Sequence, residues 1–179
     1  VVTRFATRIL EGRIFGFAHD PEMEDLHEYL LLTALCDMGQ GSSWLDNAPD
    51  PDSKIRLILN EDRCPVSILF NLRSLRGSAH AVREKWSRAS ILAIESIWEG
   101  WTKGTSGISD LHDYHDQLEE TQLRLSAFFG LNFDTMTRDS AWALLEAGRR
   151  IERSVNIVNL LAFILKQESG HIIEQLLGE

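Results

Sequence analysis

The sequence has few prolines, few cysteines and no long apolar run. It contains four prolines and two cysteines among 179 residues, so long stretches are free of the residue that breaks helices. Cys36 and Cys64 lie far apart, in apolar surroundings and without zinc-site spacing, which favours a reduced, cytoplasmic chain over a disulfide-stabilised one. No apolar stretch approaches the roughly 20 residues that span a bilayer. The opening VVTRFATRIL lacks a cleavage-like small-residue site, so we expect neither a signal peptide nor membrane insertion.

Acidic residues outnumber basic ones, but the charge is unevenly distributed. The chain has 18 Lys and Arg against 27 Asp and Glu, a net charge of −9. Residues 63–104 form a basic centre, with 7 Lys and Arg against 3 Asp and Glu, between two acidic ends. The overall acidity argues against general binding to nucleic acid or to an anionic membrane. A local basic face is compatible with this pattern.

Apolar residues recur at helical spacing in two segments. In residues 65–86 the spacing predicts one helix, with Pro65 in its first turn. In residues 137–165 it predicts a second, long helix capped by Thr135 or Thr137, with an apolar stripe that faces the core. Gly148 within that helix indicates close approach of a neighbouring helix. The first stripe comprises Ile68, Leu72, Leu75, Ala79, Val82 and Trp86, and the second comprises Ala141, Leu144, Gly148, Ile151, Val155, Val158, Ala162 and Leu165.

The remaining pattern is also helical. Further helices are expected over residues 1–17, 22–39, 52–60, 87–102, 109–129 and 170–178, with loops over 40–51 and 103–108. With 44% apolar and 25% charged residues, the composition is that of a soluble globular protein. The predicted fold is an all-α helical bundle of six to eight helices, forming a single domain over residues 1–179.

Metal-ligand spacing occurs in three places. Glu24/His27 and Glu168/His171 are Glu-x-x-His steps, as in di-iron bundles, but both lie in polar stretches. The segment DLHDYHD, residues 110–116, suits a divalent cation, yet an acidic helix N-terminus explains the same residues. We therefore expect no metal and no cofactor, and a metal-binding bundle is the third-ranked hypothesis for function.

Arginine is the remaining candidate for chemistry, since there is no Gly-x-Ser-x-Gly elbow and no glycine-rich phosphate loop. A basic stripe runs along the first helix at intervals of three, four and three, and Glu152 lies between two arginines of the second. Such residues beside a core face favour an interhelical ion-pair network. The alternative is a guanidinium cluster that binds a carboxylate or phosphate. The stripe comprises Arg73, Arg76, His80 and Arg83, and the two arginines are Arg149 and Arg153.

Segment 135–153, TMTRDSAWALLEAGRRIER, resembles the C-terminal signature of the Alpha-E family, a bacterial all-helical domain named for a Glu-Arg motif. Residues 64–101 resemble a second family segment, although Cys64 and Ser78 replace asparagines and His80 replaces an arginine. Residues 1–20 do not supply the family's earlier Glu-Arg motif, and VVTRFATRIL resembles the stretch just C-terminal to that motif, so we expect that this first motif is missing. The positions matched in the signature are Thr135, Met136, Arg138, Trp142, Leu145, Gly148, Arg149, Glu152 and Arg153, and those in the second segment include Pro65, Ser67, Ile68, Arg76, Ala79, Val82, Arg83 and Glu84.

The resemblance implies a partner rather than a reaction. Family members are associated with circularly permuted ATP-grasp and transglutaminase-like proteins, so the predicted function is a non-catalytic accessory module of an ATP-grasp-type amide-bond-forming system. The alternative is an enzyme with a pocket between the two long helices, in which Glu152 is the candidate catalytic acid or base. The sequence leaves the oligomeric state open. The predicted binding residues are Arg76, His80, Arg83, Arg138, Arg149, Glu152 and Arg153.

Overall fold

The computed structural model describes residues 44, 47–108 and 110–166, and within these ranges the chain is helical with no strand. The all-α prediction is therefore confirmed. The described ranges hold five α-helices against the six to eight expected, and the expected helices 1–17, 22–39 and 170–178 lie outside them. In chain order the elements are α4 (Pro51–Asn60), α5 (Ile68–Ala81), the short 3₁₀ helix η1 (Arg83–Lys85), α6 (Arg88–Gly104), α7 (Leu111–Thr135) and α8 (Ser140–Lys166).

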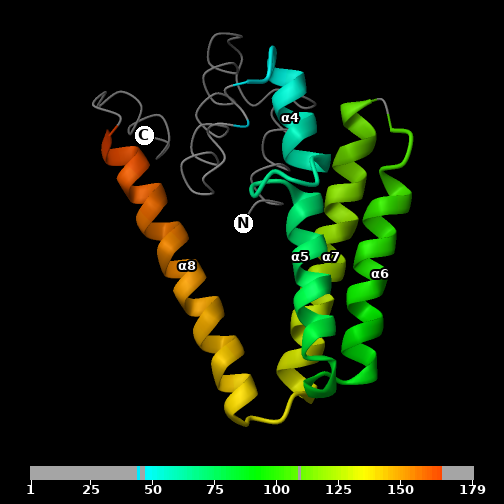
Figure 1. The fold of residues 1–179 in the computed structure, drawn as a ribbon, viewed down its shortest axis with the longest axis vertical. Helices are drawn as coiled ribbons and strands as arrows, with labels where there is room; N and C mark the ends of the chain where they lie inside the picture. Colours follow the sequence, from blue (N-terminus) through cyan, green and yellow to red (C-terminus); the bar gives the residue numbers. More distant parts are fainter. Residues whose placement is uncertain (1–43, 45–46, 109, 167–179) are drawn as a thin grey trace.

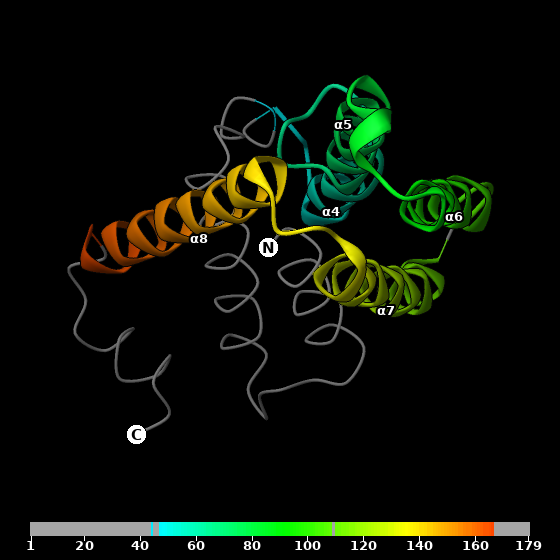
Figure 2. The same cartoon turned by 90° about the horizontal axis from the view of Figure 1, so that it is seen from below.

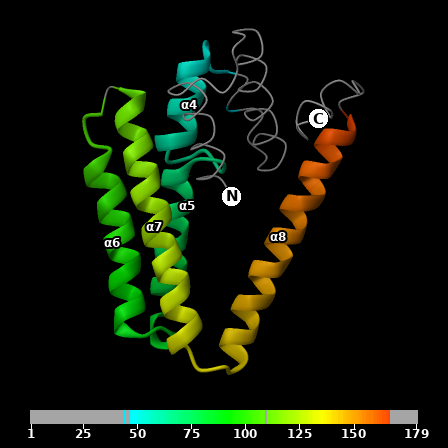
Figure 3. The ribbon, with the colours of Figure 1, turned by 180° about the vertical axis from the view of Figure 1, so that it is seen from behind.

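Helices α5, α6 and α7 lie side by side, with α6 antiparallel to the other two and α4 next to the start of α5 (Figure 1). Helix α8 leaves the lower end of α7 and diverges from this group, as the views from below and from behind also show (Figures 2 and 3). None of the described helices is long and apolar enough to cross a membrane.

The core lies between α4, α5, α6 and α7. Among the described residues, Trp101 of α6 is the largest side chain that is fully buried, and it belongs to one cluster with Leu118 and Phe128 of α7. Burial of each such side chain stabilises the fold by about 1.5–3 kcal/mol before entropy is counted. The aliphatic members of the cluster on α4, α5 and α6 are Ile55, Ile58, Leu59, Ile68, Leu72, Ala79, Ile94 and Ile97.

The helix predicted over 65–86 is two elements, and this prediction of continuity was wrong. Ser67 is the N-cap of α5, because its Oγ accepts a hydrogen bond from the Phe70 amide at 3.0 Å, so Pro65 precedes the helix. Val82 ends α5 with φ −124° and ψ 34°, outside the helical region. Ser87 then caps α6 by accepting a hydrogen bond from the Ser90 amide at 3.0 Å. Serine caps thus set the starts of α5 and α6.

The start of α8 also differs from the prediction. Asp139 caps it, since Asp139 Oδ1 accepts hydrogen bonds from the amides of Ala141 at 2.9 Å and Trp142 at 3.1 Å. Thr135 instead belongs to the last turn of α7, which runs six residues beyond the expected end at 129. The carboxylate oxygen is a strong acceptor for free amides at a helix start, and its charge is also favourable at the positive end of the helix dipole.

The expected core stripe of α8 is not in the core. Leu144, Ile151 and Val158 are exposed, whereas Phe163, on another face of the helix, is buried. Gly148 has no atom of the described neighbours within 4 Å of where a Cβ would lie, so the predicted close approach was wrong. Helical periodicity identifies an apolar face but does not identify the element that packs on it.

Candidate functional site

The best-organised polar cluster lies between α5 and α6. Arg76 Nε donates to both oxygens of Glu95, at 2.9 and 3.0 Å, and His80 Nε2 lies 2.5 Å from Glu95 Oε1. The Arg76 guanidinium also lies 5.5 Å from the centroid of the Trp98 ring. One carboxylate of α6 therefore holds two basic side chains of α5.

The geometry results from the antiparallel pairing of the helices. Arg76 and His80 are four residues apart and share one face of α5, while Glu95 faces them from α6. The hydrogen bond from Arg76, and then that from His80, lower the pKa of Glu95 below its ordinary value. The bond with Glu95 also raises the pKa of Arg76. A charged Glu95 and a charged Arg76 thus stabilise each other.

This cluster remains accessible to a ligand. The side chains of Arg76 and His80 are 41% and 44% exposed, and Arg76 uses only its Nε toward the described residues. Its two terminal nitrogens are therefore available to donate to a carboxylate or phosphate. Arg83, on η1, is exposed, and its side chain forms no hydrogen bond or ion pair with a residue in the described ranges. We call Arg76, His80 and Arg83 the basic face.

Arg73, the remaining member of the predicted basic stripe, is not part of this face. Its Nη1 donates to Asp62 Oδ2 at 2.9 Å, so it fastens the start of α5 to the preceding turn. The structure thus brings together Arg76 and His80 and separates Arg73 from them.

A second charged cluster lies on α8. Glu146 accepts from Arg150 Nε at 2.9 Å and from Arg149 Nη1 at 3.3 Å. The hydrogen bond from Arg150, aided by the charges of Arg149, Arg150 and Arg153, lowers the pKa of Glu146. The Arg149 guanidinium also lies over the ring of Phe129 on α7, 4.9 Å from the centroid. Arg149 is therefore a predicted site residue that links α8 to another described helix.

The other predicted site residues near α8 form no common site within the described ranges. Glu152 and Arg153 are exposed, and their side chains form no hydrogen bond or ion pair with the described part of the chain. Arg138 lies in the turn before α8, with its guanidinium 5.6 Å from the Trp142 ring centroid. Among the described residues, the predicted interhelical network around the Glu-Arg step is thus limited to the contact of Arg149 with Phe129.

A polar cavity of about 380 Å³ lies where α6 begins and α7 ends. On its wall, Ser90 Oγ donates to Asn132 Oδ1 at 2.6 Å, and Asn132 Nδ2 donates to the Phe128 carbonyl at 2.6 Å. None of the seven predicted binding residues is among the described residues that line this cavity. Its polar lining comprises Glu84, Lys85, Ser87, Ser90, Asn132, Thr137 and Asp139.

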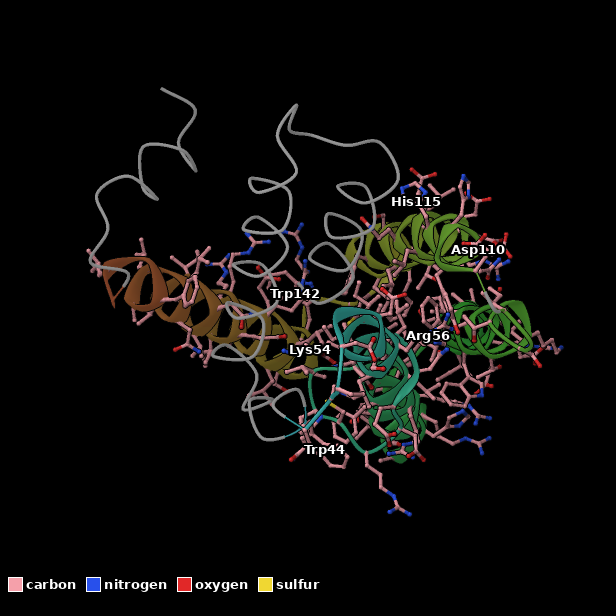
Figure 4. All side chains as sticks on the ribbon, turned by 90° about the horizontal axis from the view of Figure 1, so that it is seen from above. Trp44, Lys54, Arg56, Asp110, His115 and Trp142 are labelled. Carbon is pink, nitrogen blue, oxygen red and sulfur yellow. The ribbon has the colours of Figure 1, made fainter. Side chains whose placement is uncertain are left out.

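The acidic segment 110–116 is the start of α7 (Figure 4). Asp110 Oδ1 accepts a hydrogen bond from the His112 amide at 3.0 Å, which confirms the interpretation as an acidic helix N-terminus. Tyr114 accepts a hydrogen bond from Asn60 Nδ2 at 2.6 Å, and His115 is buried. In the described ranges no group of three or more potential ligands could hold a metal. The Glu-x-x-His steps at 24/27 and 168/171 lie outside those ranges.

Glu95 is the main residue that the sequence did not predict. It is one of three acidic residues in the basic segment 63–104. An isolated acid among basic residues is a signal for a pairing partner, but two helices must be placed before the pair can be identified. The Ser90–Asn132 pair was missed for the same reason, since its members are 42 residues apart.

Residues 5–177 match the Alpha-E family, described as a predicted alpha-helical domain with a conserved ER motif. No curated protein and no solved structure gives a significant match to the chain. The sequence contains a single Glu-Arg step, Glu152-Arg153, and the structure places it on the exposed surface of α8. Because the match spans nearly the whole chain, this all-helical protein belongs to the Alpha-E family.

Proposed function

We propose that this domain is a non-catalytic accessory module that binds an ATP-grasp-type amide-bond-forming enzyme through the basic face. The observation that supports the proposal is the pairing of Arg76 and His80 with Glu95 on an exposed surface. The enzyme class comes from the association that the family resemblance implies. The surface chemistry indicates what the enzyme must offer, namely carboxylates.

The pairing with Glu95 prepares the basic face for binding. An unpaired arginine on a surface loses rotamer entropy when it binds, about 0.5–1.5 kcal/mol for a flexible side chain. Glu95 holds the Nε edge of Arg76 in place before any partner arrives, while Trp98 lies near its guanidinium. The terminal nitrogens can then donate two parallel hydrogen bonds to one carboxylate. Arg83, three residues beyond His80 along the chain, adds a second cation.

The enzyme hypothesis has less support. It requires Arg149, Glu152 and Arg153 to line a pocket between α5 and α8. The polar cavity at the start of α6 is lined by none of the three. We therefore favour the accessory module.

Co-purification from the native host tests the proposal. Tagged domain should retrieve an enzyme that mass spectrometry identifies as an ATP-grasp-type ligase, and the double variant Arg76→Ala/Arg83→Ala should retrieve at least about tenfold less of it. The matched control is Arg63→Ala/Lys103→Ala, which removes the same charge from exposed positions outside the basic face. Circular dichroism verifies that both variants are folded. Failure to retrieve such an enzyme, or equal loss in both variants, would contradict the proposal.

A further inference from the structure

Helix α8 has two apolar faces, and they differ in how much they are covered. On the inner face Phe163 is buried and Trp142, Leu145 and Leu160 are half-buried. The other face is open to solvent. One row along it holds Leu144, 74% exposed, Ile151, 65%, Val155, 50%, Val158, 61%, and Leu165, 77%, and Ile157 and Leu161 are exposed beside this row.

The exposed face has the spacing of a coiled-coil seam. Seven exposed positions and the half-buried Ala141 alternate steps of three and four residues from 141 to 165, which is a heptad repeat over about three and a half heptads. No charged residue occupies any of them. We call these positions the α8 stripe: Ala141, Leu144, Gly148, Ile151, Val155, Val158, Ala162 and Leu165.

Residue size along the α8 stripe alternates in a way that makes it self-complementary. Smaller residues, Ala, Gly, Val and Ala, alternate with larger ones, Leu, Ile, Val and Leu. In an antiparallel pair of identical helices, an a position of one helix packs against a d position of the other. Reversal of the stripe about residue 153 then places a member of the smaller set opposite a member of the larger set in every pair. The pairs are 141 with 165, 144 with 162, 148 with 158, and 151 with 155.

A parallel pair would pack less well. It would place Gly148 opposite Gly148 and Leu144 opposite Leu144, so that underfilled layers would alternate with crowded ones. Close packing disfavours both voids and overfilled layers. We propose that the α8 stripe binds the α8 stripe of a second copy of this chain in antiparallel orientation, with the two-fold axis at Arg153.

The exposed stripe supplies the apolar centre of such a dimer interface. Helix α8 has 27 residues and is therefore about 40 Å long. A fully exposed aliphatic side chain has roughly 100 Å² of apolar surface to bury, so the exposed stripe contributes on the order of 400 Å² per copy. The two stripes together bury on the order of 800 Å² of apolar surface, so the side chains that flank them must add about 400 Å² for the contact to reach the lower end of specific interfaces, about 1,200 Å². The symmetry centre falls within the Glu152-Arg153 step, which gives the family motif a position in the assembly.

Light scattering coupled to size-exclusion chromatography tests the dimer. The full chain should have twice its 20.3 kDa mass. Ile151→Glu should weaken dimerisation at least about 100-fold, because each dimer then buries two unpaired carboxylates. Ile157→Glu is the matched control, since Ile157 is 51% exposed and lies outside the α8 stripe, and this variant should remain dimeric. A monomeric wild-type chain, or equal dissociation of both variants, would overturn the proposal.

Cross-linking tests the orientation. In a Cys36→Ser background, protein with Leu144→Cys is mixed with protein with Ala162→Cys, and a short bismaleimide is added. Antiparallel pairing predicts a 144–162 cross-link in the mixture and little self-cross-linking of either protein alone. Preferential 144–144 or 162–162 cross-links would show parallel pairing and overturn the proposal. Arg76→Ala/Arg83→Ala should dimerise normally, so this result is separable from that of the accessory-module proposal.

Discussion

At the scale of single residues, Glu95 determines the chemistry of the basic face. Its carboxylate accepts two hydrogen bonds from Arg76 and lies 2.5 Å from His80 Nε2. Without Glu95, the basic side chains of Arg76 and His80 would lie close together with no negative charge from α6 to stabilise them. The position of Arg76 therefore depends on a residue of the neighbouring helix.

Glu95→Gln should destabilise the protein in a pH-dependent way. Because the pKa of Glu95 is lowered from its ordinary 4.5 in the folded state, its stabilisation is fully present above pH 4.5 and is lost as the pH falls through the lowered value. Urea unfolding should give Glu95→Gln a lower free energy of unfolding than wild type at pH 7. The difference between the two free energies should become smaller below pH 4.5. Glu119→Gln, at an exposed position of α7, is the control. A gap that stays constant from pH 6 to pH 3 would contradict this prediction.

Cys64 should be inert in the folded protein. The thiol is free and buried, and burial raises its pKa, so little of the reactive thiolate forms. In a Cys36→Ser variant, Ellman's reagent should label Cys64 at least about 100-fold more slowly in buffer than in guanidinium chloride. Comparable rates under the two conditions would show that the α4–α5 turn opens readily.

At the scale of helices, α6 and α7 are joined by packing and by a buried polar link. Ser90 Oγ donates to Asn132 Oδ1 at 2.6 Å, and both residues are buried. The link lies where α6 begins and α7 ends, so it fixes the relative register of the two helices. Buried polar groups that lose their partner cost about 1–3 kcal/mol.

A double-mutant cycle measures this link. Asn132→Ala should lower the free energy of unfolding by about 1–3 kcal/mol, and the coupling between Ser90→Ala and Asn132→Ala should be about 0.5–1.5 kcal/mol. Ser126→Ala, on the exposed side of α7, should change stability by less than about 0.5 kcal/mol. Additive effects of Ser90→Ala and Asn132→Ala would mean that the hydrogen bond does not couple the helices.

Helices were predictable from the sequence, but their surroundings were not. Helices α4 and α6 lie within two residues of the predictions, 52–60 and 87–102, because amphipathic spacing and caps are local. The break at Val82 was missed because the apolar spacing continues past it to Trp86. The end of α5 at Val82 and the start of α6 at its serine cap do not interrupt that spacing. The role of Glu95 and the exposure of the α8 stripe depend on which helices meet, and that information is not local.

At the scale of the whole molecule, two surfaces of different chemistry lie on different elements. The basic face belongs to α5 and η1, and the α8 stripe belongs to a helix that diverges from them (Figure 1). In a chain with net charge −9, the central segment 63–104 is the basic one. This placement suits a partner that presents carboxylates, because attraction is local even though the domain is acidic overall. A dimer through α8 would present two basic faces. It would therefore bind a partner that carries two matching acidic sites more tightly than a single copy does.

The affinity of the purified domain for the retrieved ATP-grasp-type enzyme shows whether the basic face is the binding surface. Calorimetry should give a Kd that rises at least about tenfold in Arg76→Ala/Arg83→Ala and less than about twofold in Arg63→Ala/Lys103→Ala. Binding should also weaken with added salt, since the contacts are ionic. An unchanged Kd in the basic-face variant, with both variants folded, would contradict the assignment of this face as the binding surface.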